Sequence, residues 1–167
     1  MIQFEPTDAV IGARVTGISL KSPPGPDAIA QIEAALEQYG VLIFEGQDIA
    51  FSAAFASLVL TARVSARLEG HPEIFVVGNV DGQIVSFAPA DGSDDLEWHS
   101  DHMHLETPAR ASMLYCLETP PEGGETLFAC MYSGFDALDP DAHAEATRLP
   151  ALHSISGLQN FLRNKGV

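Results

Sequence analysis

The spacing of apolar residues changes near residue 70, and this change limits the folds open to the chain. Before it, apolar residues recur every three or four positions over 26–39 and 51–70, which is the spacing of helices. After it, apolar and polar residues alternate, as in strands with one buried face. Five such segments occur, at 73–79, 83–88, 97–106, 109–118 and 126–131. Helices followed by a run of strands predict an α+β or mainly β fold rather than a doubly wound sheet.

Local signals place the ends of the first helix. Pro26 suits a first helical turn, where its missing N–H costs nothing, and Gly40 suits the left-handed residue that ends a helix. The flanking segments 12–20 and 41–45 are rich in apolar residues and predict strands.

A further helix is predicted over 132–150. Ser133 or Asp139 can cap its N-terminus with a side-chain oxygen, and Pro140 suits a first turn. The sequence leaves both caps open.

The charge of the chain argues against two classes of partner. The formal net charge is −15, from 23 acidic and 8 basic residues. Such a surface repels phosphate backbones and anionic membranes, so we expect neither nucleic acid nor a membrane as partner. A small anionic substrate stays possible, because a local pocket can oppose the overall field.

The remaining composition predicts a single cytoplasmic domain. A chain of 167 residues suits one domain, and no apolar run reaches the roughly 20 residues that span a bilayer. The N-terminal residues show no basic region followed by an apolar one, so we expect no export signal. Cys116 and Cys130 form no CxxC motif, and we expect both to be buried, reduced thiols.

The segment 97–106, EWHSDHMHLE, contains three of the six histidines. His99 and Asp101 are two positions apart, so on a strand their side chains share one face and can bind one ion. Imidazole and carboxylate are the ligands of the facial triad of two histidines and one carboxylate that holds non-haem Fe(II). The alternative interpretation is a polar strand edge, because such a pair also arises by chance.

The neighbours of this pair are expected to have other roles. On a strand, Trp98 points to the opposite face, where we expect it to pack in the core. His102 and His104 also fall on that face and are assigned to the surface or to support of the site. The acidic loop 90–97 is interpreted as solvated or, alternatively, as substrate-binding.

Several motifs resemble one enzyme family. The sequence WHSD, followed by PARASMLYCLETPPEGGETLFACMYSGFDAL, is similar to the taurine dioxygenase-like (TauD/TfdA) family, as are IGARVTGISL, YGVLIFEGQ and LPALHS in the same order. The resemblance implies a double-stranded β-helix (jelly-roll) with flanking helices. It also implies an Fe(II)-dependent dioxygenase that uses 2-oxoglutarate as co-substrate.

The resemblance assigns roles to individual residues. His99 and Asp101 match the family's first two iron ligands, and Thr126 in GGET matches the residue that hydrogen-bonds a carboxylate of 2-oxoglutarate. Gly123 and Gly124 before it suit a tight turn with positive φ. Taken without the family, Thr126 is also an ordinary residue for the start of a strand.

Two further residues of the family pattern have no match. The family's third iron ligand, a histidine, and an arginine that binds 2-oxoglutarate lie further along than this sequence extends, and Arg163 does not match that arginine. Closing a jelly-roll takes about eight strands, more than the five or six predicted. We therefore expect 1–167 to be one incomplete jelly-roll dioxygenase domain, truncated before its last strands.

Two functions follow as hypotheses. The first is a dioxygenase that uses O₂ and 2-oxoglutarate to hydroxylate a small anionic organic substrate, with impaired activity in this chain alone. The second is a non-catalytic remnant that acts as a structural module. Its unpaired sheet edge would promote self-association, so a homo-oligomer is expected.

Overall fold

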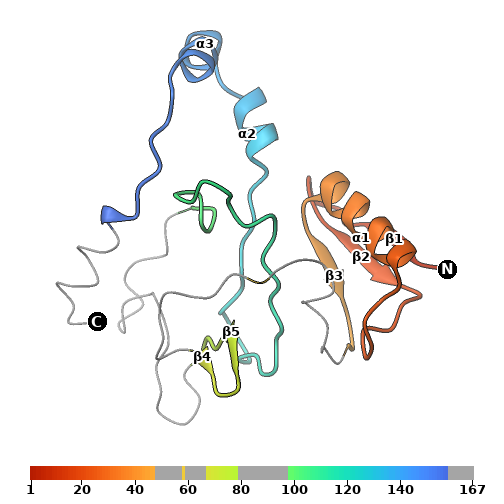
Figure 1. Cartoon of the computed structure of the whole chain (residues 1–167). Helices are drawn as coiled ribbons and strands as arrows, with labels where there is room; N and C mark the ends of the chain where they lie inside the picture. Colours follow the sequence, from red (N-terminus) through yellow and green to blue (C-terminus); the bar gives the residue numbers. More distant parts are fainter. Residues whose placement is uncertain (48–57, 59–66, 79–97, 158–167) are drawn as a thin grey trace. The chain divides into compact units, whose positions relative to one another are not determined.

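The computed structural model describes residues 1–47, 58, 67–78 and 98–157 (Figure 1). The chain divides into two compact units. One consists of Met1–Phe55 with Ser112–Val167, and the other of Ala56–Ala111.

The N-terminal part of the first unit is a three-stranded sheet with one helix. Strands β1 (Gln3–Pro6) and β2 (Ala13–Thr16) pair antiparallel, and β3 (Leu42–Phe44) pairs parallel to β2. A parallel pair needs a crossover connection, and helix α1 (Pro26–Tyr39) provides it. The strands predicted over 12–20 and 41–45 are confirmed in shorter form.

Helix α1 begins and ends where the sequence predicts. Pro26 occupies its first turn, and Gly40 follows its last residue with φ 71°. The N–H of Gly40 donates to the carbonyl of Leu36 at 2.8 Å, so one of the last carbonyls of the helix has a partner. A side chain with a Cβ would adopt this φ only with strain, which explains the glycine.

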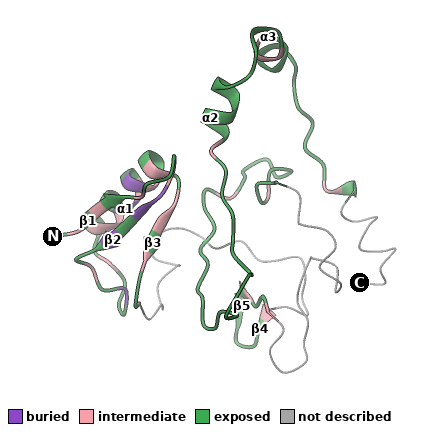
Figure 2. Cartoon of the chain, turned by 180° about the vertical axis from the view of Figure 1, so that it is seen from behind, coloured by how far each residue is buried: buried purple, intermediate pink, exposed green. Residues whose placement is uncertain are grey.

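The buried core of this part lies between the sheet and α1. Figure 2 shows buried residues in purple on β2 and α1. The buried residues are Ala13, Val15, Leu20, Ile32 and Ala35. Ala13 and Val15 are two positions apart on β2 and therefore share one face of the sheet, whereas the intervening residue is exposed. The alternation in the sequence thus gives this sheet one covered face.

The side chain of Gln47 joins the loop after β2 to the segment after β3. Its Oε1 accepts a hydrogen bond from the N–H of Leu20 at 2.8 Å. Its Nε2 donates to the carbonyl of Ile18 at 3.4 Å and to that of Glu45 at 3.2 Å. One amide side chain therefore partners backbone groups from two segments that are distant in sequence.

The helix predicted over 132–150 is divided into two. Helix α2 spans Met131–Asp136 and helix α3 spans Pro140–Arg148. Asp139 caps α3, because its Oδ1 accepts hydrogen bonds from two N–H groups of the first turn, at 3.0 Å and 2.9 Å. This cap and Pro140 in the first turn are confirmed. Ser133 lies inside α2, so its prediction as a cap is wrong.

The second unit contains a short hairpin. Strand β4 (Arg67–Leu68) pairs antiparallel with β5 (His71–Phe75), and Gly70 turns the chain between them with φ 79°. The strand predicted over 73–79 therefore begins earlier and ends at Phe75. The helix predicted over 51–70 is wrong at its C-terminal end, where β4 lies, and most of its other residues lie outside the described ranges.

Three of the predicted strands do not form in the described residues. The described part of 97–106, together with 109–118 and 126–130, has turns or irregular backbone, and residue 131 begins α2. The predicted strand 83–88 lies outside the described residues. Alternation alone does not make a strand, since its backbone N–H and C=O groups need a neighbouring strand as partner. The small sheets and helices agree with an α+β fold, whereas a jelly-roll stays a prediction.

Among the described ranges, no helix combines the length and the apolar character that crossing a bilayer requires.

Candidate metal centre

The sequence predicts that His99 and Asp101 act together, and their side chains do lie close in the second unit. Nε2 of His99 is 3.5 Å from Oδ1 of Asp101. The two side chains are 57% and 58% exposed, so both ligand atoms are accessible to an ion from solvent.

The backbone that holds this pair is a turn and not the predicted strand. His102 has φ 60°, and the N–H of Leu105 donates to the carbonyl of His102 at 3.0 Å. Residues 101–104 are therefore part of a turn that includes Asp101. The strand prediction was wrong here. Residues two positions apart can also approach each other across an irregular segment that leads into a turn, so the closeness of the pair does not require a strand.

The donor atoms fit a hard or borderline divalent ion. An imidazole nitrogen and a carboxylate oxygen are the two ligand types of the facial triad that binds Fe(II). Two such atoms at right angles on one ion, each about 2.1 Å from it, lie about 3 Å apart. The observed 3.5 Å between Nε2 of His99 and Oδ1 of Asp101 is close to this value. Small side-chain rotations would bring both atoms into place.

Among the described residues, no third protein ligand lies beside this pair. Within the ranges that the structure describes, no group of three or more His, Cys, Asp or Glu side chains is arranged to hold a metal ion. The rings of His102 and His104 lie 6.4 Å apart between centroids, tilted by 48°. The described residues thus provide half of a site.

Trp98 differs from its prediction. Its side chain is 67% exposed, whereas the sequence predicts packing in the core. That prediction depended on a strand with one face covered. Because residues 98–107 form bends and turns, the alternation does not direct Trp98 into a buried layer.

Thr126 belongs to the first unit, whereas the His99–Asp101 pair belongs to the second. Gly123 and Gly124 before it have φ values of 75° and 77°, which confirms the predicted tight turn. A Cβ on Gly124 would also approach Cγ of Pro120 to 3.0 Å. Thr126 is exposed and irregular, so the start of a strand predicted there is wrong.

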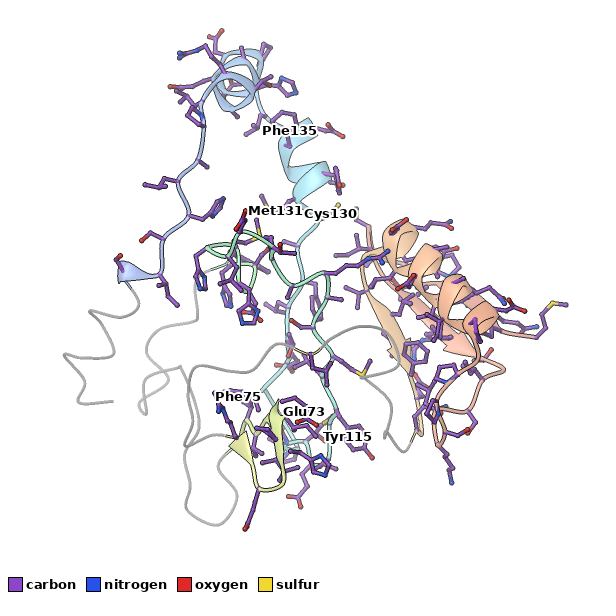
Figure 3. The ribbon with its side chains drawn as sticks, viewed as in Figure 1. Glu73, Phe75, Tyr115, Cys130, Met131 and Phe135 are labelled. Carbon is purple, nitrogen blue, oxygen red and sulfur yellow. The ribbon has the colours of Figure 1, made fainter. Side chains whose placement is uncertain are left out.

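The two cysteines are free, as predicted, but they are not buried. Cys116 is exposed and Cys130 is half-buried. Cys130 lies at the beginning of α2 (Figure 3) and is its N-cap residue. Hydrogen bonds from Ser133, first from its side chain and then from its backbone, lower the pKa of the Cys130 thiol. The sequence signal for this role is a serine three residues after a possible cap.

Comparison with known proteins identifies relatives along almost the whole chain. An (S)-phenoxypropionate/alpha-ketoglutarate-dioxygenase from Delftia acidovorans is 30% identical over 176 residues, covering 96% of this chain and 57% of that protein. An alpha-ketoglutarate-dependent 2,4-dichlorophenoxyacetate dioxygenase from Cupriavidus pinatubonensis is 29% identical, covering 89% of this chain and 56% of that protein. The chain thus spans somewhat more than half the length of these relatives.

A crystal structure of a taurine dioxygenase from Burkholderia xenovorans matches a smaller part. It is 36% identical over 44% of this chain and 29% of that chain, with a TM-score of 0.41. The model of the family described as "Taurine catabolism dioxygenase TauD, TfdA family" matches residues 3–165. This match confirms the resemblance of the WHSD and GGET motifs, and the chain belongs to the TauD/TfdA family.

Proposed function

We propose that this chain is part of an Fe(II)- and 2-oxoglutarate-dependent dioxygenase that hydroxylates a small anionic organic substrate. The observation that carries the proposal is the 3.5 Å approach of Nε2 of His99 to Oδ1 of Asp101, within the WHSD motif of a TauD/TfdA family chain. Family membership alone would not show that this pair can act on one ion.

His99 and Asp101 are proposed as two of the iron ligands. Both side chains are more than half exposed, so an ion can reach them without opening a core. The bound iron would activate O₂ beside 2-oxoglutarate. Oxygen is then reduced with four electrons: two come from 2-oxoglutarate as it becomes succinate and CO₂, and two come from a C–H bond as it becomes C–OH.

Thr126 is proposed to bind a carboxylate of 2-oxoglutarate through its hydroxyl. The turn at Gly123 and Gly124 leads the chain into Thr126, and the residue is exposed, so its Oγ1 is accessible to a ligand. A hydroxyl that donates to a carboxylate makes a charge-assisted bond, which is stronger than a neutral one.

The relatives suggest the class of substrate. Phenoxypropionate and 2,4-dichlorophenoxyacetate, named for two of them, are both carboxylates of modest size. We propose a small organic anion for this chain as well. The chain has a net charge of −15, and this overall field repels anions. Binding such a ligand therefore requires a local basic group.

The domain organisation is part of the proposal. We propose that 1–167 forms part of one jelly-roll dioxygenase domain that works in the cytoplasm. The chain spans 57% and 56% of the two relatives. We propose that a third iron ligand and an arginine that binds 2-oxoglutarate complete the site.

The test measures succinate formed from 2-oxoglutarate by the native polypeptide that contains this sequence. The polypeptide is supplied with Fe(II), O₂ and a panel of small carboxylates and sulfate esters. Succinate formation that rises with one of these substrates and is lost in both His99→Ala and Asp101→Ala supports the proposal. Succinate formation that persists in His99→Ala, or its complete absence from the native polypeptide, contradicts it.

A second candidate function is a self-associating module without catalysis. The observation that favours it is the exposure of large apolar side chains in 112–132, including Leu114 at 66%, Leu117 at 80% and Leu127 at 71%. Exposed apolar surface of this kind promotes association. Sedimentation of the 167-residue chain distinguishes the two functions when it is combined with the succinate assay.

A further inference from the structure

His102, directly after the proposed ligand Asp101, has an unusual backbone conformation. Its φ is 60°, and it is the only residue other than glycine with positive φ among those the structure describes. An L-amino acid in this left-handed region is strained, because its Cβ approaches the backbone carbonyl. Glycine adopts the conformation freely, and asparagine, aspartate and histidine adopt it more readily than other residues, although it stays uncommon for them.

The side chain of His102 also differs from those around it. Over 98–108 it alone is half-buried, whereas the other side chains are exposed. Its Nδ1 is shielded from solvent and has no hydrogen-bond partner within the described part of the chain. A buried polar atom without a hydrogen-bond partner is unfavourable. His102 therefore combines two unfavourable features, its positive φ and its shielded Nδ1. Such strain persists where the surrounding structure requires it, often at functional sites.

The conformation of His102 determines the path of the backbone after Asp101. Residues 101–104 form a turn that contains the positive φ of His102, and the N–H of Leu105 donates to the carbonyl of His102 at 3.0 Å. Asp101 is the first residue of this turn, and its Oδ1 lies 3.5 Å from Nε2 of His99.

We infer that His102 is a positioning residue, whose left-handed backbone conformation holds the Asp101 carboxylate beside His99 for metal binding. The inference rests on the proposed function to the extent that the His99–Asp101 pair binds the metal. It goes beyond that function because it assigns the role to the backbone of a residue that is not itself a ligand.

Two measurements on the whole chain test this role, and neither depends on turnover. The first is Co(II) binding, followed by its visible absorption. The second is hydrogen exchange of the Leu105 N–H without metal, which reports whether the turn is closed. The variants are His102→Gly and His102→Asn, which tolerate positive φ, and His102→Val, whose branched Cβ opposes it.

His102→Val is expected to weaken Co(II) binding about tenfold and to speed exchange at Leu105 by a similar factor, because left-handed backbone is costly for this residue. His102→Gly and His102→Asn are expected to stay near the parent in both measurements. His104→Val is the matched control: it changes the other histidine of the turn in the same way, at a residue without positive φ, and should leave Co(II) affinity within about twofold.

Each contrary result has one meaning. If His102→Gly binds Co(II) as weakly as His102→Val, the imidazole and not the backbone matters, and the inference is overturned. It is also overturned if His102→Val opens the turn at Leu105 without weakening Co(II) binding, or changes neither. If the parent chain binds no Co(II), both the metal site and the positioning role of His102 are contradicted. Absence of succinate formation with Co(II) binding intact contradicts the proposed function alone.

Discussion

Nε2 of His99 lies 3.5 Å from Oδ1 of Asp101, although the segment that carries them is not a strand. The two side chains are therefore brought together by the local path of the chain and not by the pleat of a sheet. This makes the pair sensitive to the turn that follows it. It also makes the pair testable in the isolated chain, because no neighbouring strand is needed to form it.

Replacing His99 or Asp101 by alanine is expected to lower Co(II) affinity by about a hundredfold or more, because even groups that only support metal ligands typically account for 10–100-fold. Anaerobic Fe(II) binding should follow the same order. Titration monitored by absorption or calorimetry measures the effect. His104→Ala serves as the control and should keep most of the affinity. A result in which His104 matters and Asp101 does not would show that a different pair binds the metal.

Replacing Thr126 by valine is expected to weaken 2-oxoglutarate binding and to leave metal affinity unchanged. The lost hydroxyl-to-carboxylate bond is worth about 1.5–3 kcal/mol, which is roughly tenfold or more in Kd. Thr126→Ser keeps the hydroxyl and should bind nearly as well as the parent. The measurement is a 2-oxoglutarate titration of the metal-loaded native polypeptide. Equal 2-oxoglutarate affinity in the valine and serine variants would show that the Thr126 hydroxyl does not bind the co-substrate.

Replacing Gln47 by alanine is expected to loosen the loop after β2. The N–H of Leu20 donates to Oε1 of Gln47 at 2.8 Å, and Leu20 is almost fully buried. A buried donor that loses its partner costs about 1–3 kcal/mol, so exchange of this N–H should speed up about tenfold or more. The N–H of Ala13, which donates to the carbonyl of Val41 at 2.9 Å, is the internal reference.

Gln47→Glu provides the matched comparison for this loop. It keeps an oxygen that can accept from Leu20 but removes the donor that reaches the carbonyls of Ile18 and Glu45. Protection at Leu20 should therefore fall less than in Gln47→Ala. Equal exchange in both variants would show that the bond to Leu20 is not what orders the loop.

Cys130 is expected to react faster than Cys116 with iodoacetamide near neutral pH. Hydrogen bonds from Ser133 lower the pKa of the Cys130 thiol, and a lowered pKa means that more thiolate is present at a given pH below it. The advantage of Cys130 should thus persist as pH falls below the ordinary thiol range. Mass spectrometry of alkylated peptides measures both sites in one sample, and Cys116 is the reference.

Ser133→Ala tests the cause of this reactivity. The change removes the side-chain hydrogen bond, the largest contribution to the lowered pKa, and leaves the backbone N–H that lies 3.5 Å from the Cys130 sulfur. Alkylation of Cys130 should slow severalfold near neutral pH and recover at higher pH, where the thiolate forms without help. An unchanged rate would mean that exposure and not the hydrogen bonds controls the reaction.

The elements that the sequence predicts correctly are those specified by local chemistry. Helix α1 begins at Pro26 and is followed by Gly40. Proline fixes φ at a helical value and glycine tolerates positive φ, and both effects act regardless of tertiary context. Asp139 caps α3 for the same reason, since its carboxylate reaches N–H groups two and three residues ahead. The region 132–150 therefore contains two helices: α2 ends at Asp136, and α3 begins at Pro140 with Asp139 as its cap.

The predicted strands fail where formation depends on a partner. Alternation over 97–106, 109–118 and 126–131 shows which residues could share a face, but hydrogen bonds from another strand must form the ladder. The proximity of His99 and Asp101 was predicted correctly because residues two apart stay close in extended and irregular backbone alike. The left-handed φ of His102 was not predicted, because positive φ is uncommon even for histidine, which adopts it more often than most residues.

The last prediction concerns residues 1–167 by themselves: they should form little succinate from 2-oxoglutarate. Two side chains hold an ion more weakly than three, and the described residues contain no group of three that could hold a metal. If no arginine of this chain reaches 2-oxoglutarate, one carboxylate of the co-substrate also loses a two-bond, charge-assisted contact. The exposed apolar side chains of 112–132 should meanwhile make the chain associate.

Succinate formation and sedimentation are therefore measured on the same purified sample, beside the native polypeptide. Little succinate from an associated chain, with turnover by the native polypeptide, is the expected result. Robust turnover by a monodisperse monomer would overturn the prediction, because a third ligand would then have to come from this chain. His102, His104, His143 and His153 are the candidates, and alanine variants of each, assayed for Co(II) affinity, would identify the one that supplies it. Only such a ligand would lower Co(II) affinity as strongly as the loss of His99 or Asp101, whereas a histidine that merely supports the fold would not.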